Sequence, residues 1–386
     1  MKKLSTMKVL IVGIRGLGIE TAKNIILNGP REVDIFDPSL VKINDLGCNF
    51  FLTEDDVGKK RDETCVGKLS ELNSYVKVSV LKLEKKIVKD EQYINYFCEK
   101  IERYDVVVFT EIQPKNILTE VDKFCREKNI KLIYGFCFGL VGYIFTDFGR
   151  SHIIFDENGK EVEKYFVKSI SHDKEGLVTI DTIENTKSLR FGDGDFVKFE
   201  KIRGMTELND KNREFKIEYN NNESFKIGDT SNFGEYIRGG VVYEVKKPKE
   251  MQYLDFGSAT ELSCHKMNPF QPKDFKKNGR AELLYLTYFG IQEFYLENKC
   301  ILPELNNIEQ AKKITENVKK MYDDVKKKNY PFFSNIQNFD QKIVLNVARW
   351  AADKCSTYLW FLWRYYCSRN YKNNWEIHSN KSMVYT

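Results

Sequence analysis

Long apolar runs are missing from this 386-residue sequence, since none approaches the about 20 residues that a membrane-spanning helix needs. The start, Met1-Lys2-Lys3-Leu4, is followed by no apolar core of a signal peptide. An excess of one charge is missing too, because 61 Lys and Arg against 56 Asp and Glu leave a net charge of +5 on a chain that is 30% charged. We therefore expect neither a membrane nor a nucleic-acid partner.

Cysteine motifs and histidine clusters are also absent. No two of the nine cysteines form a Cys-x-x-Cys motif, so neither a disulfide framework nor a zinc site is predicted. We expect reduced thiols and a cytoplasmic and nuclear location. The four histidines (His152, His172, His265 and His378) have no ligand spacing, so no metal site is expected. A chain that is 42% hydrophobic and 13% aromatic is globular and not disordered.

The first part of the chain alternates strands with helices. Residues 8–14 form an apolar run that ends in a glycine turn, which is typical of a buried parallel strand. A helix is predicted over residues 19–27 and is ended by Asn28-Gly29-Pro30. Further strands are predicted at 33–37, 76–81, 105–110 and 131–136, with a helix near 115–127. This alternation predicts a doubly wound α/β sheet.

The pattern changes at about residue 148. Short apolar runs now lie between turn clusters such as Glu157-Asn158-Gly159, which predicts a small inserted all-β domain. Its expected strands are 153–155, 177–180, 196–199, 215–217, 225–227 and 241–245. From about residue 250 the pattern is helical, with helices predicted at 280–298 and 307–329.

A glycine turn joins the first strand to the first helix. Gly13, Gly16 and Gly18 would let a phosphate approach the helix N-terminus, and Asp37 after the second strand could accept a hydrogen bond from a ribose hydroxyl. The glycine spacing differs from that of dinucleotide-binding dehydrogenases, so both a nucleotide-binding ancestry and a plain tight turn remain open. We expect Arg15 within this turn to be a solvated or interface side chain.

The turn belongs to a series of motifs: Val9-Leu10-Ile11-Val12-Gly13, Arg15-Gly16-Leu17-Gly18, Phe36-Asp37-Pro38, Asn49-Phe50-Phe51-Leu52 and Asp56-Val57-Gly58-Lys59-Lys60-Arg61. A second series follows: Gly194-Asp195-Phe196-Val197-Lys198-Phe199, Ile202-Arg203-Gly204-Met205, Asp229-Thr230-Ser231-Asn232-Phe233 and Tyr236-Ile237-Arg238-Gly239-Gly240. The first series resembles the inactive, ThiF-like adenylation half of ubiquitin-activating enzymes. The second resembles their first catalytic-cysteine half-domain.

The resemblance covers residues 1–359 and implies a domain order. It implies an inactive adenylation domain over residues 1–147 and the all-β half-domain over 148–247. A four-helix bundle would follow over 248–335, and the chain would return to the adenylation domain over 336–359.

The resemblance also implies a nucleotide site without its chemistry. The family's active half uses an arginine, a lysine and a metal-binding acid. Here Cys48 stands at the arginine position, Arg61 lies near the lysine position, and Thr110-Glu111-Ile112-Gln113 has no aspartate pair. We therefore interpret the turn glycines and Asp37 as a vestigial nucleotide site with weak binding at best. No catalytic residue is assigned, because the five cysteines before residue 140 are expected to be small core side chains.

The implied function is that of the N-terminal part of an enzyme that adenylates the ubiquitin C-terminus with ATP and Mg²⁺ and then forms a thioester. The family's thioester cysteine is expected beyond this chain. This part would bind no cofactor itself, and it would pack on the active adenylation half. Ubiquitin and ubiquitin-conjugating enzymes would be partners of the complete enzyme. Two alternatives remain open, a free-standing regulatory subunit of a split activating enzyme and a nucleotide-dependent oxidoreductase.

The tail over residues 360–386 departs from the family. It carries three Trp and four Tyr without a helical or strand period, where the family has a glycine pair, Gln-Glu, Gly-Lys-Phe and Gln-Trp. Back-translation with AT-rich codons, read one base later, restores these motifs in order. We interpret the tail as a reading-frame slip between Leu359 and Trp360, with an amphipathic or membrane tail as the competing account. We expect a disordered or misplaced segment.

Overall fold

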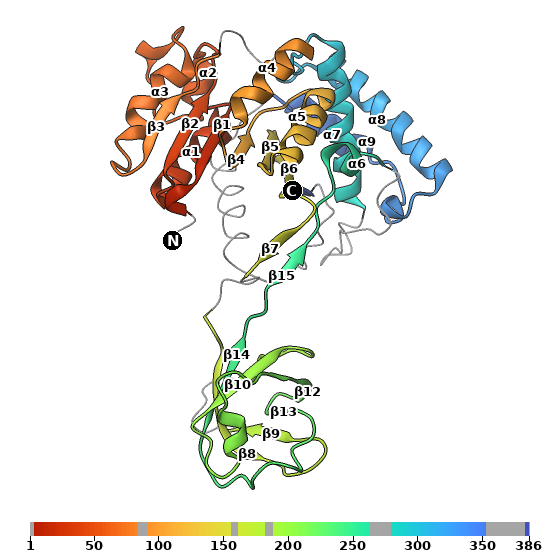
Figure 1. Cartoon of the computed structure of the whole chain (residues 1–386). Coiled ribbons are helices and arrows are strands. Elements are labelled where there is room, and N and C mark those ends of the chain that lie inside the picture. The colour runs from red at the N-terminus through yellow and green to blue at the C-terminus, as the bar shows by residue number, and fades with distance from the viewer. Residues whose placement is uncertain are drawn as a thin grey trace. The chain divides into compact units, whose positions relative to one another are not determined.

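The computed structural model describes residues 4–83, 91–155, 161–181, 188–262, 279–352 and 383–385. The chain divides into two compact units (Figure 1). The described residues up to His152 and those from Met251 on belong to the first unit, and Ile153–Glu250 forms the body of the second. The second unit is thus inserted into the sequence of the first.

The first unit contains a mostly parallel sheet. Its order along the described strands is β16-β6-β5-β4-β1-β2-β3. Strands β1 to β5 pair in parallel, whereas β6 runs antiparallel to β5. The strands are β1 (Lys8–Val12), β2 (Glu32–Phe36), β3 (Lys77–Val80), β4 (Val106–Phe109), β5 (Lys131–Phe138), β6 (Val141–Asp147) and β16 (Met383–Tyr385).

Helices cover both faces of this sheet. On one face, Val9 and Ile11 of β1 pack with the apolar sides of α1 (Gly16–Asn28) and α3 (Arg61–Ser70). On the other face, Leu10 and Val12 of β1 belong to a larger core that includes α4 (Glu91–Ile101) and α5 (Lys115–Glu127). Alternate side chains of a strand point to opposite faces, so an apolar β1 serves two cores. The doubly wound α/β prediction is confirmed.

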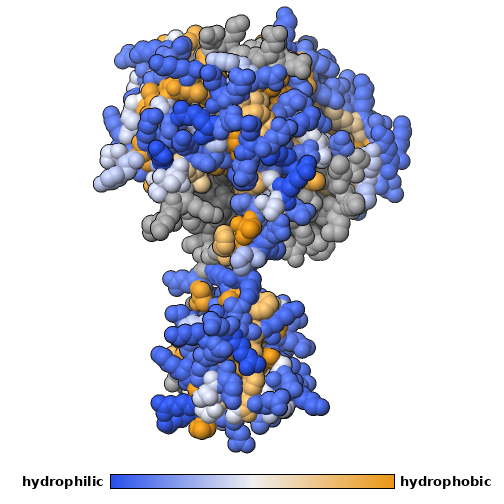
Figure 2. Space-filling model, viewed as in Figure 1, coloured by the Kyte–Doolittle hydropathy of each residue, from blue (hydrophilic) through white to orange (hydrophobic). Residues whose placement is uncertain are grey.

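The helical part packs on β5 and β6. It comprises α6 (Phe256–Ala259), α7 (Arg280–Glu297), α8 (Ile308–Lys328) and α9 (Gln341–Arg349). The rings of Tyr288 on α7 and Tyr143 on β6 stack at a centroid distance of 4.0 Å. The Asn307 side chain caps α8 by accepting from the amide of Gln310. The visible surface is mainly hydrophilic, with scattered apolar side chains (Figure 2).

The second unit is a separate antiparallel β domain with its own apolar core, which includes Phe199, Phe225 and Val242. Its described sheet has the order β11-β10-β14-β8-β9-β13-β12. These strands are β8 (Lys164–Ile170), β9 (Leu177–Ile180), β10 (Phe196–Glu200), β11 (Phe215–Lys216), β12 (Glu218–Asn221), β13 (Ser224–Lys226) and β14 (Val241–Val245). Where the chain enters and leaves the domain, β7 (His152–Ile154) pairs with β15 (Lys249–Met251). An inserted all-β domain is thereby confirmed.

Three residues of the tail form a strand that its pattern does not predict. Met383–Tyr385 pairs antiparallel with β6, with Val384 opposite Tyr143. Such pairing is made by backbone groups at the edge of a sheet, so it needs no alternation of apolar side chains. The rest of the suspected frame-shifted segment lies outside the described residues.

Candidate functional site

The glycine turn brings the end of β1 into contact with the start of α1. Gly13 has φ +94°, a conformation that favours glycine. A Cβ atom on Gly18 would lie 2.0 Å from the carbonyl oxygen of Gly13. The backbones of these two residues are therefore too close for any residue other than glycine at position 18. Gly16 is buried as the first residue of α1. The three predicted glycines therefore lie together in one turn.

Asp37 meets this turn from the end of β2. Its Oδ2 atom accepts a hydrogen bond from the amide of Ile14 at 2.8 Å, and its Oδ1 atom accepts one from the amide of Ser39 at 3.2 Å. The amide of Asp37 itself donates to Asp62. Asp37 is 4% exposed. The structure thus brings the predicted acid and glycines together, with the carboxylate turned into the protein.

Arg61 occupies the space next to Asp37. Its guanidinium is 2% exposed and forms ion pairs with Asp37 and, at 2.7 Å, with Asp45. It also donates to the carbonyl of Leu40 at 3.3 Å. Burial alone lowers the pKa of Arg61, but the carboxylates of Asp37, Glu111 and Asp45 outweigh it and raise that pKa. The cation near the family's lysine position is therefore held by the chain's own acids.

Asp45 binds a second cation. Its Oδ1 atom accepts from Nε of Arg15 at 3.0 Å, and Arg15 also lies 3.7 Å from Glu111. Burial raises the pKa of Asp45, but the amide of Lys42 and the two arginines outweigh it and lower that pKa. We expected Arg15 to be a solvated or interface side chain. The Arg15 side chain is 27% exposed and pairs with Asp45 within the chain, and its role at an interface stays a prediction.

Asn49 stands in one of the motifs quoted above, but that motif assigns it no role in the site. It is fully buried, and its Nδ2 atom donates to the carbonyl of Ile14 at 3.1 Å and contacts Sγ of Cys65 at 3.5 Å. It thereby ties the glycine turn to α3. A buried amide in an otherwise apolar stretch needs hydrogen-bond partners, which is the signal that could have pointed to it.

The cysteines near this site are buried thiols. Cys48, at the family's arginine position, is 7% exposed and contacts the carbonyl of Asp45. Burial raises the pKa of the Cys65 thiol to about 11, and it does the same for Cys98. Cys125 and Cys137 are buried as well. The prediction that these five cysteines are small core side chains is confirmed.

The segment after β4 closes the turn from the other side. The Thr110 hydroxyl donates to the carbonyl of Gly13 at 2.7 Å, and Glu111 follows in the segment that lacks the aspartate pair. Within the described ranges, no group of three or more His, Cys, Asp or Glu side chains is placed to hold a metal ion. The helices described there include none that is long and apolar enough to cross a membrane.

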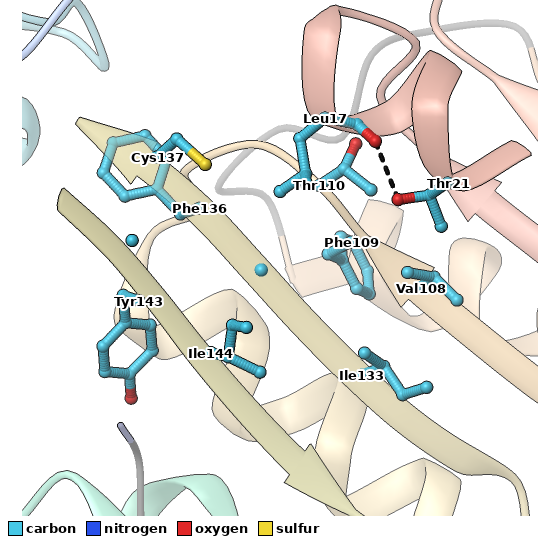
Figure 3. A pocket seen from close by; sticks show the side chains of 12 residues that line it. Leu17, Thr21, Val108, Phe109, Thr110, Ile133, Phe136, Cys137, Tyr143 and Ile144 are labelled. Atoms are coloured by element: carbon cyan, nitrogen blue, oxygen red, sulfur yellow. Dashed lines mark hydrogen bonds between the residues drawn. The ribbon is translucent and has the colours of Figure 1, made fainter. Parts of the chain in front are cut away.

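A small apolar cavity lies beside the turn (Figure 3). It has a volume of about 20 Å³ and is lined by Leu17 and Thr21 of α1 together with residues of β4, β5 and β6. A single water needs roughly 10–15 Å³ of such volume, so the cavity is far too small for a nucleotide. Two of the residues that line it, Gly135 on β5 and Gly142 on β6, have no side chain to fill the space beside α1.

Two protein families match this chain. The ThiF family matches residues 1–194, and the ubiquitin-activating enzyme E1 FCCH domain matches residues 173–246. A solved structure of E. coli MccB aligns over 37% of this chain and 41% of that chain, at 25% identity and a TM-score of 0.33.

Several curated proteins are similar over most of the chain. Ubiquitin-like modifier-activating enzyme 1 of Oryctolagus cuniculus is 37% identical over 297 residues, which is 76% of this chain and 26% of the relative. The Dictyostelium discoideum protein of the same name is 37% identical over 82% of this chain and 29% of its own length. Ubiquitin-activating enzyme E1 1 of Triticum aestivum is 37% identical over 77% and 27%. The chain thus spans between a quarter and a third of these relatives. It belongs to the ThiF family and carries the FCCH domain of ubiquitin-activating enzymes.

Proposed function

We propose that this chain is the non-catalytic adenylation half of a ubiquitin-activating enzyme, together with its first catalytic-cysteine half-domain. In the complete enzyme, ATP and Mg²⁺ would bind to a separate, active half, which adenylates the ubiquitin C-terminus. This chain would support that half and would bind no nucleotide of its own. The relatives' names and the FCCH match over residues 173–246 support this role.

The observation that carries the proposal is the state of Asp37. A ribose-binding acid must offer a carboxylate oxygen to the ribose hydroxyl, yet Asp37 is 4% exposed and is paired with the buried Arg61. Arg15 beside the turn is likewise paired with Asp45. A triphosphate needs unpaired cations to offset its charge. A site whose arginines are already neutralised by carboxylates provides no such binding energy.

The sheet face beside α1 supports a docking role. Helices α1 and α3 pack over β1 and β2 on this face, while Gly135 and Gly142 contribute no side chain to the small cavity that Leu17 lines. Ile144 and Thr146 on β6 are partly exposed there. Such a face suits close packing of a second apolar layer. We propose that the active adenylation half binds here.

Ubiquitin-dependent ATP–pyrophosphate exchange tests this function. The chain alone is expected to give no exchange above the buffer background, because it lacks an available ribose acceptor and phosphate-binding cations. Exchange should appear when an active adenylation half is added. That half should also co-purify with the chain. Measurable exchange by the chain alone would contradict the proposal.

Thermal unfolding with added nucleotide separates the alternatives. At millimolar ATP and Mg²⁺, or at millimolar NAD, we expect no increase in the unfolding temperature, since a ligand that does not bind cannot stabilise the fold. A large shift with NAD would favour an oxidoreductase. Co-purification with a distinct catalytic chain would favour the regulatory subunit of a split activating enzyme.

A further inference from the structure

The segments that lead to and from the inserted domain are held by three polar contacts within the first unit. The carboxylate of Asp147, the last residue of β6, accepts from the amide of Gly149 at 2.7 Å. On α5, Arg126 donates to the carbonyl of Tyr253 at 2.6 Å, and Asp122 accepts from the amide of Phe256 at 2.7 Å. Residues far apart in sequence therefore fix both connections at one place.

Two buried carboxyl groups meet at the centre of these contacts. Asp122 and Asp147 are each 1% exposed, and burial, followed by the nearby charge of Asp147, raises the pKa of Asp122. Arg126 pairs with Oδ2 of Asp147 at 2.5 Å. The Oδ1 atom of Asp122 is buried and receives no N–H or O–H from the protein described around it. Arg126 forms its ion pair with Asp147, and no described cation forms one with Asp122, so an ionised Asp122 would be a buried charge without a partner, which is costly.

A proton on Asp122 resolves this arrangement. It would turn the unpartnered Oδ1 atom into a donor to Asp147, and it would leave one carboxylate for one guanidinium. We propose that Asp122 and Asp147 share one proton at neutral pH and act as a proton-dependent clamp on the two segments that connect the inserted domain. Loss of this proton would weaken the hold of α5 on residues 253–256.

Other titratable groups surround the carboxyl pair. Burial, and then the charge of Asp147, raises the pKa of Tyr253 to about 12, and burial keeps the adjacent Cys125 a neutral thiol. Lys131 on β5 faces Asp147, and burial lowers its pKa. Asp255 caps α6 and is held ionised by its hydrogen bonds with Ser258, although burial opposes this by raising its pKa. His152 contacts the rings of Phe148 and Tyr253 and not the carboxyl pair.

The sign of the pH effect follows from the shift. Burial, and then the charge of Asp147, raises the pKa of Asp122 from 3.8 to about 8. A group whose pKa is higher in the folded than in the unfolded protein stabilises the folded state fully when the pH is below its unfolded-state pKa. This contribution is lost as the pH rises toward its folded-state pKa. The clamp should therefore weaken from about pH 4 to pH 8 and stay constant above. The largest slope is roughly tenfold in the opening constant per pH unit.

The test compares the protein with its Asp122→Asn variant, whose amide copies the protonated carboxyl. Amide hydrogen exchange is followed at Gly149 and Phe256 from pH 5 to pH 9 and is corrected for the intrinsic rate. Relative to D122N, the opening constant of the unsubstituted protein should rise up to about tenfold per pH unit below pH 8. The Asp255→Asn variant should keep this rise, because Asn caps a helix as well as Asp does. Parallel profiles in D122N and the unsubstituted protein would overturn the clamp.

A second measurement remains decisive if D122N folds poorly. Carboxyl ¹³C shifts of the unsubstituted protein should show one aspartate that titrates in mildly alkaline solution, and Asp147→Asn should lower that midpoint by removing the neighbouring negative charge. If no aspartate titrates above pH 6, the proton is not shared and the proposal fails.

Discussion

Replacing Arg61 by alanine is expected to lower the free energy of unfolding of the α/β unit by about 3–5 kcal/mol, because it leaves buried carboxylates without their cation. Asp37 and Asp45 are 4% and 1% exposed, so water cannot replace the lost partner. Urea denaturation followed by circular dichroism, combined with amide exchange in β1 and β2, measures the loss for this unit. A change below about 1 kcal/mol would show that the ion pairs of Arg61 with Asp37 and Asp45 contribute little.

Lys60→Ala is the matched control. Lys60 immediately precedes Arg61, but its side chain is 52% exposed and pairs with Glu63 on the surface. Such a pair is screened by solvent, so its removal should leave the unfolding free energy within measurement error.

Measuring the unfolding free energy as the pH is lowered tests the same ion pairs of Arg61 with Asp37 and Asp45 independently. Burial raises the pKa of Asp45, but hydrogen bonds and the two arginines lower it below 3.8 in the folded protein. This stabilisation is present above the unfolded pKa and is lost as pH falls through the folded value. The stability difference between the unsubstituted protein and R61A should therefore shrink as the pH falls below about 4.

Gly18→Ala is expected to destabilise the same unit by about 3 kcal/mol or more, because the new methyl group meets the backbone of Gly13, which cannot rotate away as a flexible side chain would. Its Cβ would lie 2.0 Å from the carbonyl oxygen of Gly13 and 2.7 Å from Oγ1 of Thr110. To relieve this, α1 must move away from β1, and the Ile14–Asp37 hydrogen bond would break. The midpoint of thermal unfolding measures the effect.

Gly67→Ala is the control for this second substitution. Gly67 lies in the interior of α3, where a Cβ atom meets nothing within 4 Å. Alanine should therefore stabilise the helix by about 0.5–1 kcal/mol, since glycine is the more flexible residue in the unfolded chain. If both variants unfolded at the same temperature, the close approach of Gly13 and Gly18 would not be what determines the turn.

The strands and helices with strong apolar patterns were predictable. Residues 115–127 match α5 in full, and the runs at 177–180 and 241–245 match β9 and β14. Strand β8 was harder to predict, because a register shift between Val167 and Ser169 breaks the alternation of its buried side chains. Strand β6 was missed as well, since Gly142 and Thr146 interrupt its apolar residues and it lacks the continuous run of a buried parallel strand.

The sequence predicted which residues form the glycine turn and its acid, but it did not predict which side chains pair with each other. The sequence motifs contain Gly13, Gly18 and Asp37, and the structure brings these together. Nothing in a motif states that Arg61 will turn inward to Asp37, because that depends on where α3 begins relative to β2. Asp45 was missed for the same reason, since a lone acid after a loop is usually solvated. Its burial follows from two arginines that converge on it.

The insertion of one unit into the other has a consequence for synthesis on the ribosome. Tyr134 on β5 is covered by Tyr288 on α7, and 154 residues separate the two in the sequence. At roughly 5–20 residues per second, the ribosome needs about 8–30 s to make the covering helix. Before that interval ends, the second unit has all of its own core residues and can fold, while the aromatic residues of β5 and β6 are still not covered by α7. The nascent chain therefore passes through a period in which it needs protection from aggregation.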